Sequence, residues 1–237
     1  MVDMRKIGLV GGMSWHSTLE YYRVLNEQFA TTRGGHASAR VVLESLDFAE
    51  VRECQATGDW ARASRLLTEA AVRCQASGAE AVVICTNLMH RVADGVESAL
   101  DIPLLHIADA IADRAHEGGW SQVGVLGTSW VAAEDFYAGR LARGGLTVHV
   151  PPADAQTEID RVIFEELTLG RIEESSRATY VEVIADLRDA GAEAVVLACT
   201  EIGLLVRPED SLLPLLDSMV VHAEAAAGWA LGAPVGA

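Results

Sequence analysis

The chain has 237 residues, half of them hydrophobic, and a formal net charge of −16. This length is enough to bury a sizeable core, and no run reaches the roughly 18 apolar residues that a membrane span needs. The strong negative charge repels phosphate groups, which excludes nucleic acids and anionic membranes as partners.

Short apolar runs alternate with helical patterns along the chain, beginning directly after Lys6. No charged and apolar export signal precedes the first run, so we expect a cytoplasmic protein. The strands are predicted at 5–10, 40–46, 80–85, 103–106, 122–127, 146–150, 193–198 and 214–217. The helices are predicted at 16–31, 58–77, 89–99, 107–117, 132–143, 154–169, 173–190 and 218–232. This alternation is typical of α/β folds with open parallel sheets and right-handed crossovers.

Three segments of the first half return in the second half, in the same order and 111 to 116 residues later. The first match pairs residues 7–12 with 123–128, and the second pairs residues 103–105 with 214–216. The third match pairs the segment through Cys85 with the segment through Cys199, which carries one extra residue, Ala198. We infer a duplication into two pseudo-symmetric Rossmann-like or flavodoxin-like domains with the active site in the cleft between them. The predicted domains are 1–108 with 217–237, the last helix returning to the first domain, and 109–216.

Two of the four cysteines, Cys85 and Cys199, end matching strands of the repeat. Ligands of open parallel sheets bind beyond the carboxyl ends of the strands. Inversion of a carbon that bears hydrogen needs one group to remove a proton and another to return a proton on the opposite face. Two thiols can do this, because the environment easily shifts their pKa of about 8.5 toward neutrality. A lone cysteine at a strand end is usually core, but two at matching positions favour catalysis. Cys54 and Cys74 are assigned to packing, and a redox pair is disfavoured because no CxxC spacing is present.

The residues around these thiols are candidates for substrate binding. Backbone N–H groups near Thr86 and Thr200 can hold a carboxylate, although either threonine could instead cap a helix. The loop that begins at Gly11 lacks the spacing of a dinucleotide or P-loop motif and suits a small carboxylate better, although Ser14 could also be only a cap. Arg40 could pair with a carboxylate or lie at a surface strand end, and His90 and His222 could assist the thiols but are more often structural. The predicted substrate-binding residues are Met13, Ser14, Arg40, Thr86, Asn87, Thr128, Thr200 and Glu201.

No cofactor is expected for this chemistry. Lys6 is the only lysine, and it precedes the first strand, so a pyridoxal phosphate Schiff base is nearly excluded. No group of histidines and cysteines has zinc spacing, so no metal is expected either.

Several motifs carry a resemblance to the aspartate/glutamate racemase family, which runs nearly from end to end. The matching segments are GLVGGMSWHSTLEYY, LESLDF, CTNLMH, HIADA, LGT, DFYAGRL, IFEELTLG and ACTEIGLLV, and they look most like the bacterial broad-specificity amino-acid racemases. The resemblance implies a pyridoxal-independent two-base mechanism with Cys85 and Cys199, two similar α/β domains and a homodimer. Aspartate-specific members look to carry an arginine at Arg40 and a lysine where this chain has Thr168, so strict aspartate specificity is in doubt.

The expected substrate is therefore a small amino acid, either aspartate or glutamate or a broader range that includes homoserine. Maleate isomerases, hydantoin racemases and arylmalonate decarboxylases are similar in architecture and form the nearest alternatives. Decarboxylation needs only one protonating thiol, so the presence of both cysteines argues against it. Maleate isomerisation uses one cysteine for covalent addition, and the CTN and CTE contexts of the two cysteines favour a racemase. A non-catalytic amino-acid-binding protein would leave the twin cysteines unexplained.

Overall fold

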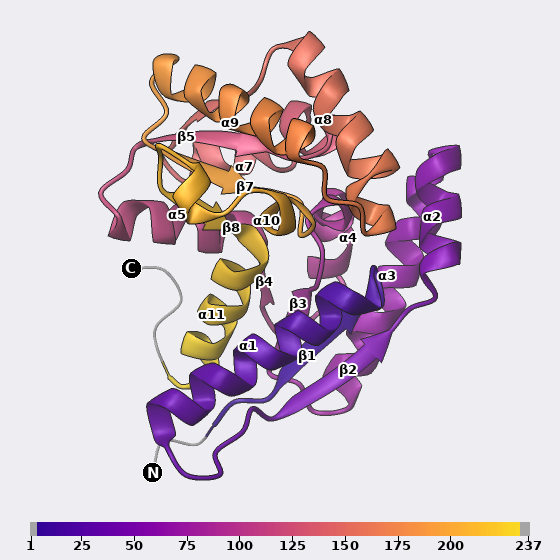
Figure 1. The fold of residues 1–237 in the computed structure, drawn as a ribbon. Coiled ribbons are helices and arrows are strands. Elements are labelled where there is room, and N and C mark those ends of the chain that lie inside the picture. Colours follow the sequence, from indigo (N-terminus) through magenta and orange to yellow (C-terminus); the bar gives the residue numbers. More distant parts are fainter. Residues whose placement is uncertain (1–3, 233–237) are drawn as a thin grey trace. The chain divides into compact units, whose positions relative to one another are not determined.

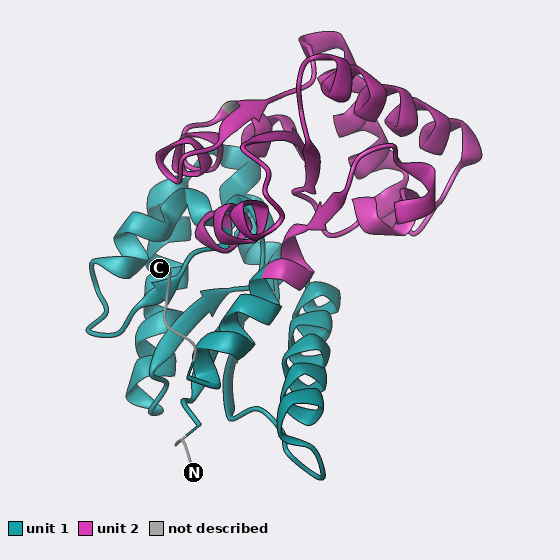
Figure 2. Ribbon diagram, turned by 90° about the vertical axis from the view of Figure 1, so that its left-hand side faces the viewer, with its two compact units in different colours: residues 1–107, 222–237 teal, residues 108–221 magenta. Residues whose placement is uncertain are grey.

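The structure, a computed structural model, describes residues 4–232. The chain forms two compact units, coloured separately in Figure 2. Unit 1 comprises residues 1–107 and 222–237, and unit 2 comprises residues 108–221. The chain passes between them within two helices, α5 (Ile107–Glu117) and α11 (Ser218–Ala230).

Unit 1 is built on a parallel sheet with strand order β2-β1-β3-β4. Its elements are β1 (Ile7–Gly11), α1 (Trp15–Arg33), β2 (Val41–Ser45), α2 (Phe48–Thr57), α3 (Trp60–Ala76), β3 (Ala81–Ile84), the 3-10 helix η1 (Leu88–Val92), α4 (Ala93–Glu97) and β4 (Leu104–Leu105) (Figure 1). Ile7 of β1 lies opposite Val41 of β2 and Ala81 of β3. The central strands β1 and β3 are buried throughout, which is why their sequences are continuous apolar runs rather than alternating ones.

Helices cover both faces of this sheet. Gly8 of β1 lies against Cys74 of α3, and Gly11, three residues later on the opposite face, lies against Thr18 of α1. Alternation of side chains along a strand explains this division, since residues 8 and 11 point to opposite sides. The α3 face holds a core cluster around Val10, Val82 and Ile84.

Unit 2 repeats the design with strand order β6-β5-β7-β8, also fully parallel. Its elements are β5 (Gln122–Leu126), α6 (Ser129–Ala133), α7 (Ala138–Arg143), β6 (Thr147–His149), α8 (Ala153–Glu165), the 3-10 helix η2 (Leu167–Leu169), α9 (Glu174–Asp189), β7 (Ala194–Leu197), α10 (Ile202–Leu205), the 3-10 helix η3 (Pro208–Asp210) and β8 (Leu215–Asp217). The identical order in the two sheets confirms the predicted fold class, and it follows from the repeated order of apolar runs in the sequence.

Hydrogen bonding corrects one detail of the repeat. The Cys85 N–H bonds to the carbonyl of Val10, whereas in unit 2 the equivalent carbonyl, that of Leu126, accepts from Ala198. Ala198 therefore occupies the register of Cys85, and Cys199 lies one residue further beyond its strand. The two thiols follow equivalent strands but are not at equivalent positions, because the extra residue of the second copy is inserted between strand and cysteine.

Three predicted helices are shorter or more broken than expected. The segment 132–143 forms two helices, α6 and α7, because Glu134 has an extended backbone that interrupts the hydrogen-bond ladder. The segment 89–99 forms η1 followed by the single-turn helix α4. The helix predicted over 154–169 ends at Glu165, and a 3-10 turn follows.

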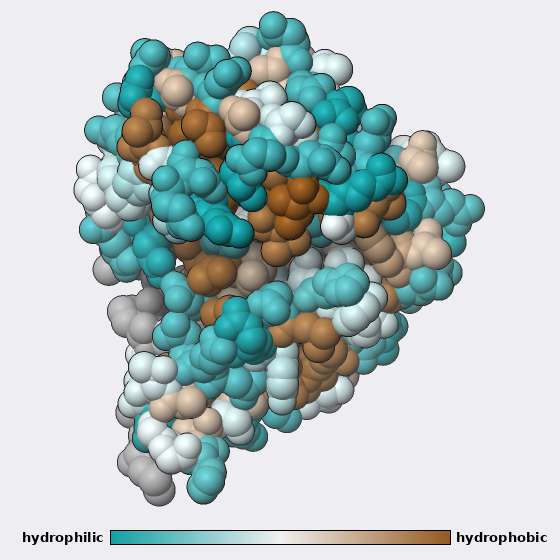
Figure 3. Space-filling model, in the orientation of Figure 1, coloured by the Kyte–Doolittle hydropathy of each residue, from teal (hydrophilic) through white to brown (hydrophobic). Residues whose placement is uncertain are grey.

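The surface is mostly polar, with apolar side chains gathered in patches. One such patch in Figure 3 lies where Figure 1 shows α1 and β2. Within residues 4–232, no helix combines the length and the apolar character needed to cross a membrane.

Candidate active site

Cys85 lies at the carboxyl edge of the unit 1 sheet, directly after β3. Its backbone N–H donates to Val10 at 2.9 Å, which fixes the residue as an extension of the strand. The side chain is fully buried, and burial raises the pKa of its thiol, with the nearby Cys74 as a smaller cause. Burial therefore favours the protonated thiol over the thiolate at this position.

The loop after β1 lies at the same edge and is shaped by Gly12. This residue has a φ of +86°, and a Cβ there would overlap the backbone of Leu46, so only glycine fits. Its N–H donates to Thr18 Oγ1 at 2.9 Å. Met13 is buried, and Ser14 stands at the N-cap position of α1 without a side-chain capping bond. The interpretation of Ser14 as only a helix cap is therefore not supported.

Thr86 and Asn87 continue the chain from Cys85. Thr86 is half-buried and Asn87 is buried, and Asn87 stands before η1 without a side-chain capping bond. The Asn87 side chain is thus not used as a cap of η1. Both residues remain at the edge where the thiol lies.

The two candidate histidines, His90 and His222, bond to other groups than the thiol. His90 has Nδ1 at 2.8 Å from the Thr86 carbonyl and Nε2 at 3.3 Å from the Ile107 N–H. His222 has Nε2 at 2.8 Å from the Leu105 carbonyl and Nδ1 at 2.8 Å from the Tyr21 hydroxyl. All four ring nitrogens have partners other than the thiols, which agrees with the structural reading of these two histidines.

Arg40 does not reach this edge. It immediately precedes β2, at the amino edge of the sheet, where it is exposed and donates to the Met4 carbonyl at 3.2 Å. A strand of five residues separates it from the carboxyl edge, roughly 16 Å at 3.3 Å per residue. The prediction that Arg40 binds substrate is therefore corrected. The arginine begins its strand, whereas the candidate site forms where the strands end.

Arg52, which the sequence motifs did not single out, is a cation on the helix that follows the carboxyl end of β2. Arg52 lies on α2, the helix that leaves the carboxyl end of β2, and donates to Gln55 Oε1 at 2.8 Å. Gln55 in turn contacts the Met89 sulfur at 3.2 Å, in the segment that follows Cys85. Its position after the LESLDF motif was the available signal, since a residue after a strand end faces the ligand side.

Cys199 lies at the carboxyl edge of unit 2 and is half-buried. Its thiol donates to Glu201 Oε2 at 3.2 Å, and Thr200 Oγ1 donates to the same oxygen at 2.7 Å. Burial, followed by the negative charge of Glu201, raises the pKa of Cys199 well above its ordinary value. Thr200 serves Glu201 rather than capping α10, so the capping alternative does not apply to it.

Thr128 follows β5, at the same edge of unit 2. It is buried at the start of α6, and its Oγ1 has no hydrogen-bond partner among residues 4–232. A buried hydroxyl without a partner is costly, which makes it a candidate contact for a polar ligand. Thr168, in contrast, is exposed and bonds back to the Phe164 carbonyl.

The lysine and the two cysteines that were not expected to take part in the reaction lie elsewhere. Lys6 precedes β1 at the amino edge and donates to the Ser77 carbonyl at 3.0 Å. Cys54 and Cys74 are buried in the α3-side core, and burial raises the pKa of Cys74 to about 11. Across residues 4–232, no cluster of three histidine, cysteine or acidic side chains is arranged to hold a metal.

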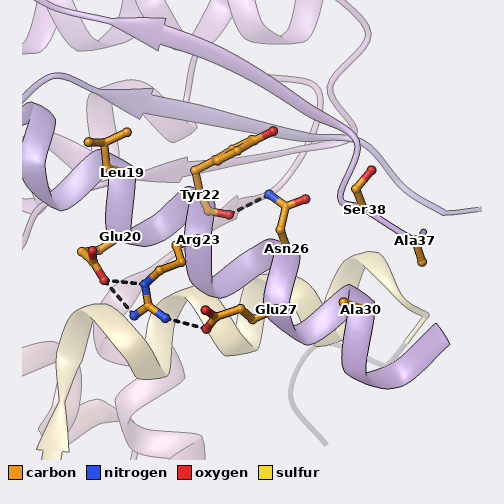
Figure 4. A pocket seen from close by; sticks show the side chains of 9 residues that line it. All are labelled: Leu19, Glu20, Tyr22, Arg23, Asn26, Glu27, Ala30, Ala37 and Ser38. Atoms are coloured by element: carbon orange, nitrogen blue, oxygen red, sulfur yellow. Dashed lines mark hydrogen bonds and ion pairs between the residues drawn. The ribbon is translucent and has the colours of Figure 1, made fainter. Parts of the chain in front are cut away.

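A surface hollow of about 620 Å³ lies along α1 and is separate from the thiol loops. Its lining comes from the outer face of α1 and from the segment that leads to β2: Leu19, Glu20, Tyr22, Arg23, Asn26, Glu27, Ala30, Ala37 and Ser38 (Figure 4). Arg23 pairs with Glu20 and Glu27 across its floor. None of these residues belongs to the predicted catalytic set.

Comparison with known proteins gives consistent matches. The Asp/Glu/hydantoin racemase family model matches residues 10–226. A structure from Yersinia pestis described as a candidate Asp/Glu racemase is 44% identical, with a TM-score of 0.93, over 96% of this chain and 100% of that one. An aspartate racemase homologue from Pyrococcus horikoshii OT3 is 30% identical, with a TM-score of 0.85, over 96% of this chain and 100% of that one. The aspartate racemase of Picrophilus torridus, 20% identical with a TM-score of 0.73 over 98% of this chain and 96% of that one, shares the fold.

Proposed function

The chain belongs to the Asp/Glu/hydantoin racemase family, and on that premise we propose that it is a cofactor-independent amino-acid racemase with Cys85 and Cys199 as its two bases. One observation carries the proposal. Each thiol follows the third strand of its parallel sheet, at the carboxyl edge, and the two sheets have the same strand order. A duplicated fold of this kind supplies two similar groups, which is what inversion at one carbon requires.

In the proposed reaction one sulfur, as thiolate, takes the α-proton, and the other, as thiol, returns a proton to the opposite face. Burial favours the protonated thiol at both positions, so one proton must leave before abstraction begins. For Cys199, Glu201 Oε2 lies within hydrogen-bond distance and is the proposed acceptor of that proton. In the reverse direction the same contact holds Cys199 as the proton donor.

The proposed substrate is a small amino acid whose α-carboxylate is held by the backbone around Thr86 and Asn87. Arg52 supports an acidic side chain because its helix leaves the sheet at the same edge as Cys85. Thr168, where aspartate-specific members look to carry a lysine, offers no second cation. The proposed range therefore includes aspartate and glutamate and extends to neutral amino acids such as homoserine.

The proposal is tested by proton NMR of the purified protein in D2O with L-aspartate, L-glutamate or L-homoserine, without added cofactor. The expected result is loss of the α-proton signal together with the D-enantiomer on a chiral column. Absence of exchange with all three amino acids would contradict the proposal.

A second candidate is racemisation of a hydantoin, which the matching family model also includes by name. The same two thiols would invert C5 of the ring. A 5-substituted hydantoin tested in the same experiment separates the two, since exchange only at C5 of the hydantoin would favour this alternative.

We also propose a homodimer, formed through a surface that we call the α1 patch: Trp15, Leu19 and Tyr22 of α1 with Leu43 of β2. These side chains are 47–57% exposed. The spacing of the first three places them on one helix face, and Leu43, like Thr18, lies over Gly11 on the α1 side of the edge strand. An exposed apolar cluster beside an unpaired strand edge is typical of a protein interface.

A further inference from the structure

Three buried imidazoles, those of His90, His106 and His222, form a cluster in unit 1 that the proposed reaction does not use. The ring of His90 lies 4.4 Å from that of His106 and 5.7 Å from that of His222, centre to centre. All three side chains are at most 4% exposed. Burying three imidazoles is costly unless their nitrogens are satisfied, so their hydrogen bonds define their role.

The hydrogen bonds of His90 fix its protonation state. A carbonyl only accepts, so the nitrogen facing Thr86, Nδ1, must carry a proton. The nitrogen facing the Ile107 N–H, Nε2, must accept and therefore carries none. His90 is thus the neutral Nδ1–H tautomer, and burial, with His106 and His222 beside it, holds the pKa of His90 well below its ordinary value.

His222 holds the adjoining backbone through its Nε2. Its Nε2 faces the Leu105 carbonyl and must donate, so in the neutral ring Nδ1 accepts from the Tyr21 hydroxyl. Within the segment from Leu105 to Ile107, the Ile107 N–H therefore donates to His90 and the Leu105 carbonyl accepts from His222. Hydrogen bonds thus link α1 to α11 and α11 to the backbone at Leu105, and a second run links the backbone at Ile107 through His90 to the residue after Cys85.

We propose that His90 is a positioning residue for the reaction at Cys85, through the hydrogen bond from its Nδ1–H to the Thr86 carbonyl. In a trans peptide the N–H of the next residue points opposite to the carbonyl. Holding the Thr86 carbonyl toward His90 therefore gives the Asn87 N–H one fixed direction, away from the imidazole. This rests on the proposed function, because it assigns a role to the backbone beside one of the two proposed bases.

Two substitutions separate this role from packing. In His90→Asn the side-chain amide nitrogen takes the place of Nδ1 and can still donate to Thr86, whereas the partner of Ile107 is lost. In His90→Gln the amide takes the place of Nε2, so Ile107 keeps its partner and Thr86 loses its donor. Each variant loses one buried hydrogen bond, so a purely structural role would weaken both alike.

The test follows α-proton exchange in D2O for each enantiomer separately, with Cys85→Ser as the reference. That reference identifies the enantiomer whose proton Cys85 removes. We expect His90→Gln to slow exchange of that enantiomer by about tenfold to a hundredfold, with the other enantiomer little changed, and His90→Asn to remain near the wild-type rates. Equal losses for both enantiomers, or equal losses in the two variants, would overturn the proposal.

A second measurement does not depend on turnover. Nitrogen-15 NMR of the histidine rings, with assignment by the His90→Asn variant, is expected to show His90 protonated at Nδ1 alone. An Nε2–H tautomer of His90 would overturn the proposal even if no amino acid proves to be a substrate.

Discussion

The thiol of Cys199 donates a hydrogen bond to Oε2 of Glu201 across 3.2 Å. Thr200 donates to the same oxygen at 2.7 Å, so the carboxylate is held in place by the two residues that precede it. The Cys199 sulfur and the Glu201 carboxylate are therefore in direct contact. The negative charge of Glu201 adds to burial in raising the pKa of Cys199.

Glu201→Gln should lower the pKa of Cys199, because it removes the charge that disfavours the thiolate while keeping the size of the side chain. The measurement is the pH dependence of Cys199 alkylation, followed by mass spectrometry of the modified peptide. The midpoint should move to lower pH in Glu201→Gln and stay in place in Glu182→Gln, an exposed control on α9. An unchanged midpoint in Glu201→Gln would show that the carboxylate does not act on the thiol.

Gly12→Ala should destabilise unit 1 more than an ordinary replacement at positive φ. Gly12 and Gly34 have φ values of +86° and +70°, but a Cβ on Gly12 would overlap the Leu46 backbone whereas one on Gly34 meets nothing within 4 Å. Gly34→Ala should cost about 1 kcal/mol and Gly12→Ala at least about 2 kcal/mol more in free energy of unfolding, measured by urea denaturation. Similar losses at the two positions would contradict the packing of the loop.

Unfolding should become easier as the pH falls from 7.5 to 5, in part because His90 is held neutral. Its folded pKa lies below 6.5, so below about pH 6.5 the unfolded chain binds a proton that the folded chain does not. Stability from this group is lost as pH falls, with a limiting slope of about 1.4 kcal/mol per pH unit. The groups around it are His106, His222 and Tyr21.

The measurement compares the free energy of unfolding of wild type and His90→Asn across this range. The variant should be less stable at pH 7.5 but show a shallower decline toward pH 5. His36→Asn, at an exposed position, serves as the control and should follow the wild type. A decline in His90→Asn as steep as in the wild type would contradict the assignment.

The α1 patch should govern self-association. Sedimentation equilibrium of the wild type is expected to give twice the chain mass, and Leu19→Glu should shift the protein toward the monomer, since it places a charge in an apolar contact. Leu212→Glu changes a leucine that is also exposed but lies in unit 2, and it should leave the dimer intact. A wild type that is monomeric at all concentrations would contradict the proposed interface.

Much of the fold could be predicted from the sequence because buried parallel strands are written as continuous apolar runs. Both sheets, their parallel direction and the edge on which the cysteines lie follow from that pattern. The breaks within helices could not be predicted, since the interruption at Glu134 depends on backbone conformation rather than on periodicity. The position of Cys199 relative to Cys85 required hydrogen-bond register, because one inserted residue can lie inside a strand or after it.

Less of the candidate site than of the fold could be predicted from the sequence. Residues that follow strand ends lie at the expected edge in the structure. Arg40, which was also predicted there, does not lie at this edge, because it begins its strand. Arg52 was not predicted because helical arginines are usually solvated, whereas its contact with Gln55 connects it to the segment after Cys85. The roles of His90 and His222 depend on which carbonyl each ring faces, and sequence spacing does not specify this.

The most direct test of the two-thiol mechanism is α-proton exchange in D2O by Cys85→Ser and Cys199→Ser, each measured separately with the L- and the D-amino acid. A serine hydroxyl is too weak an acid to replace the thiol, so each variant should lose racemisation. Each should still exchange the α-proton of one enantiomer without inverting it, and the two variants should retain opposite enantiomers. Either single variant racemising at the wild-type rate would contradict the mechanism.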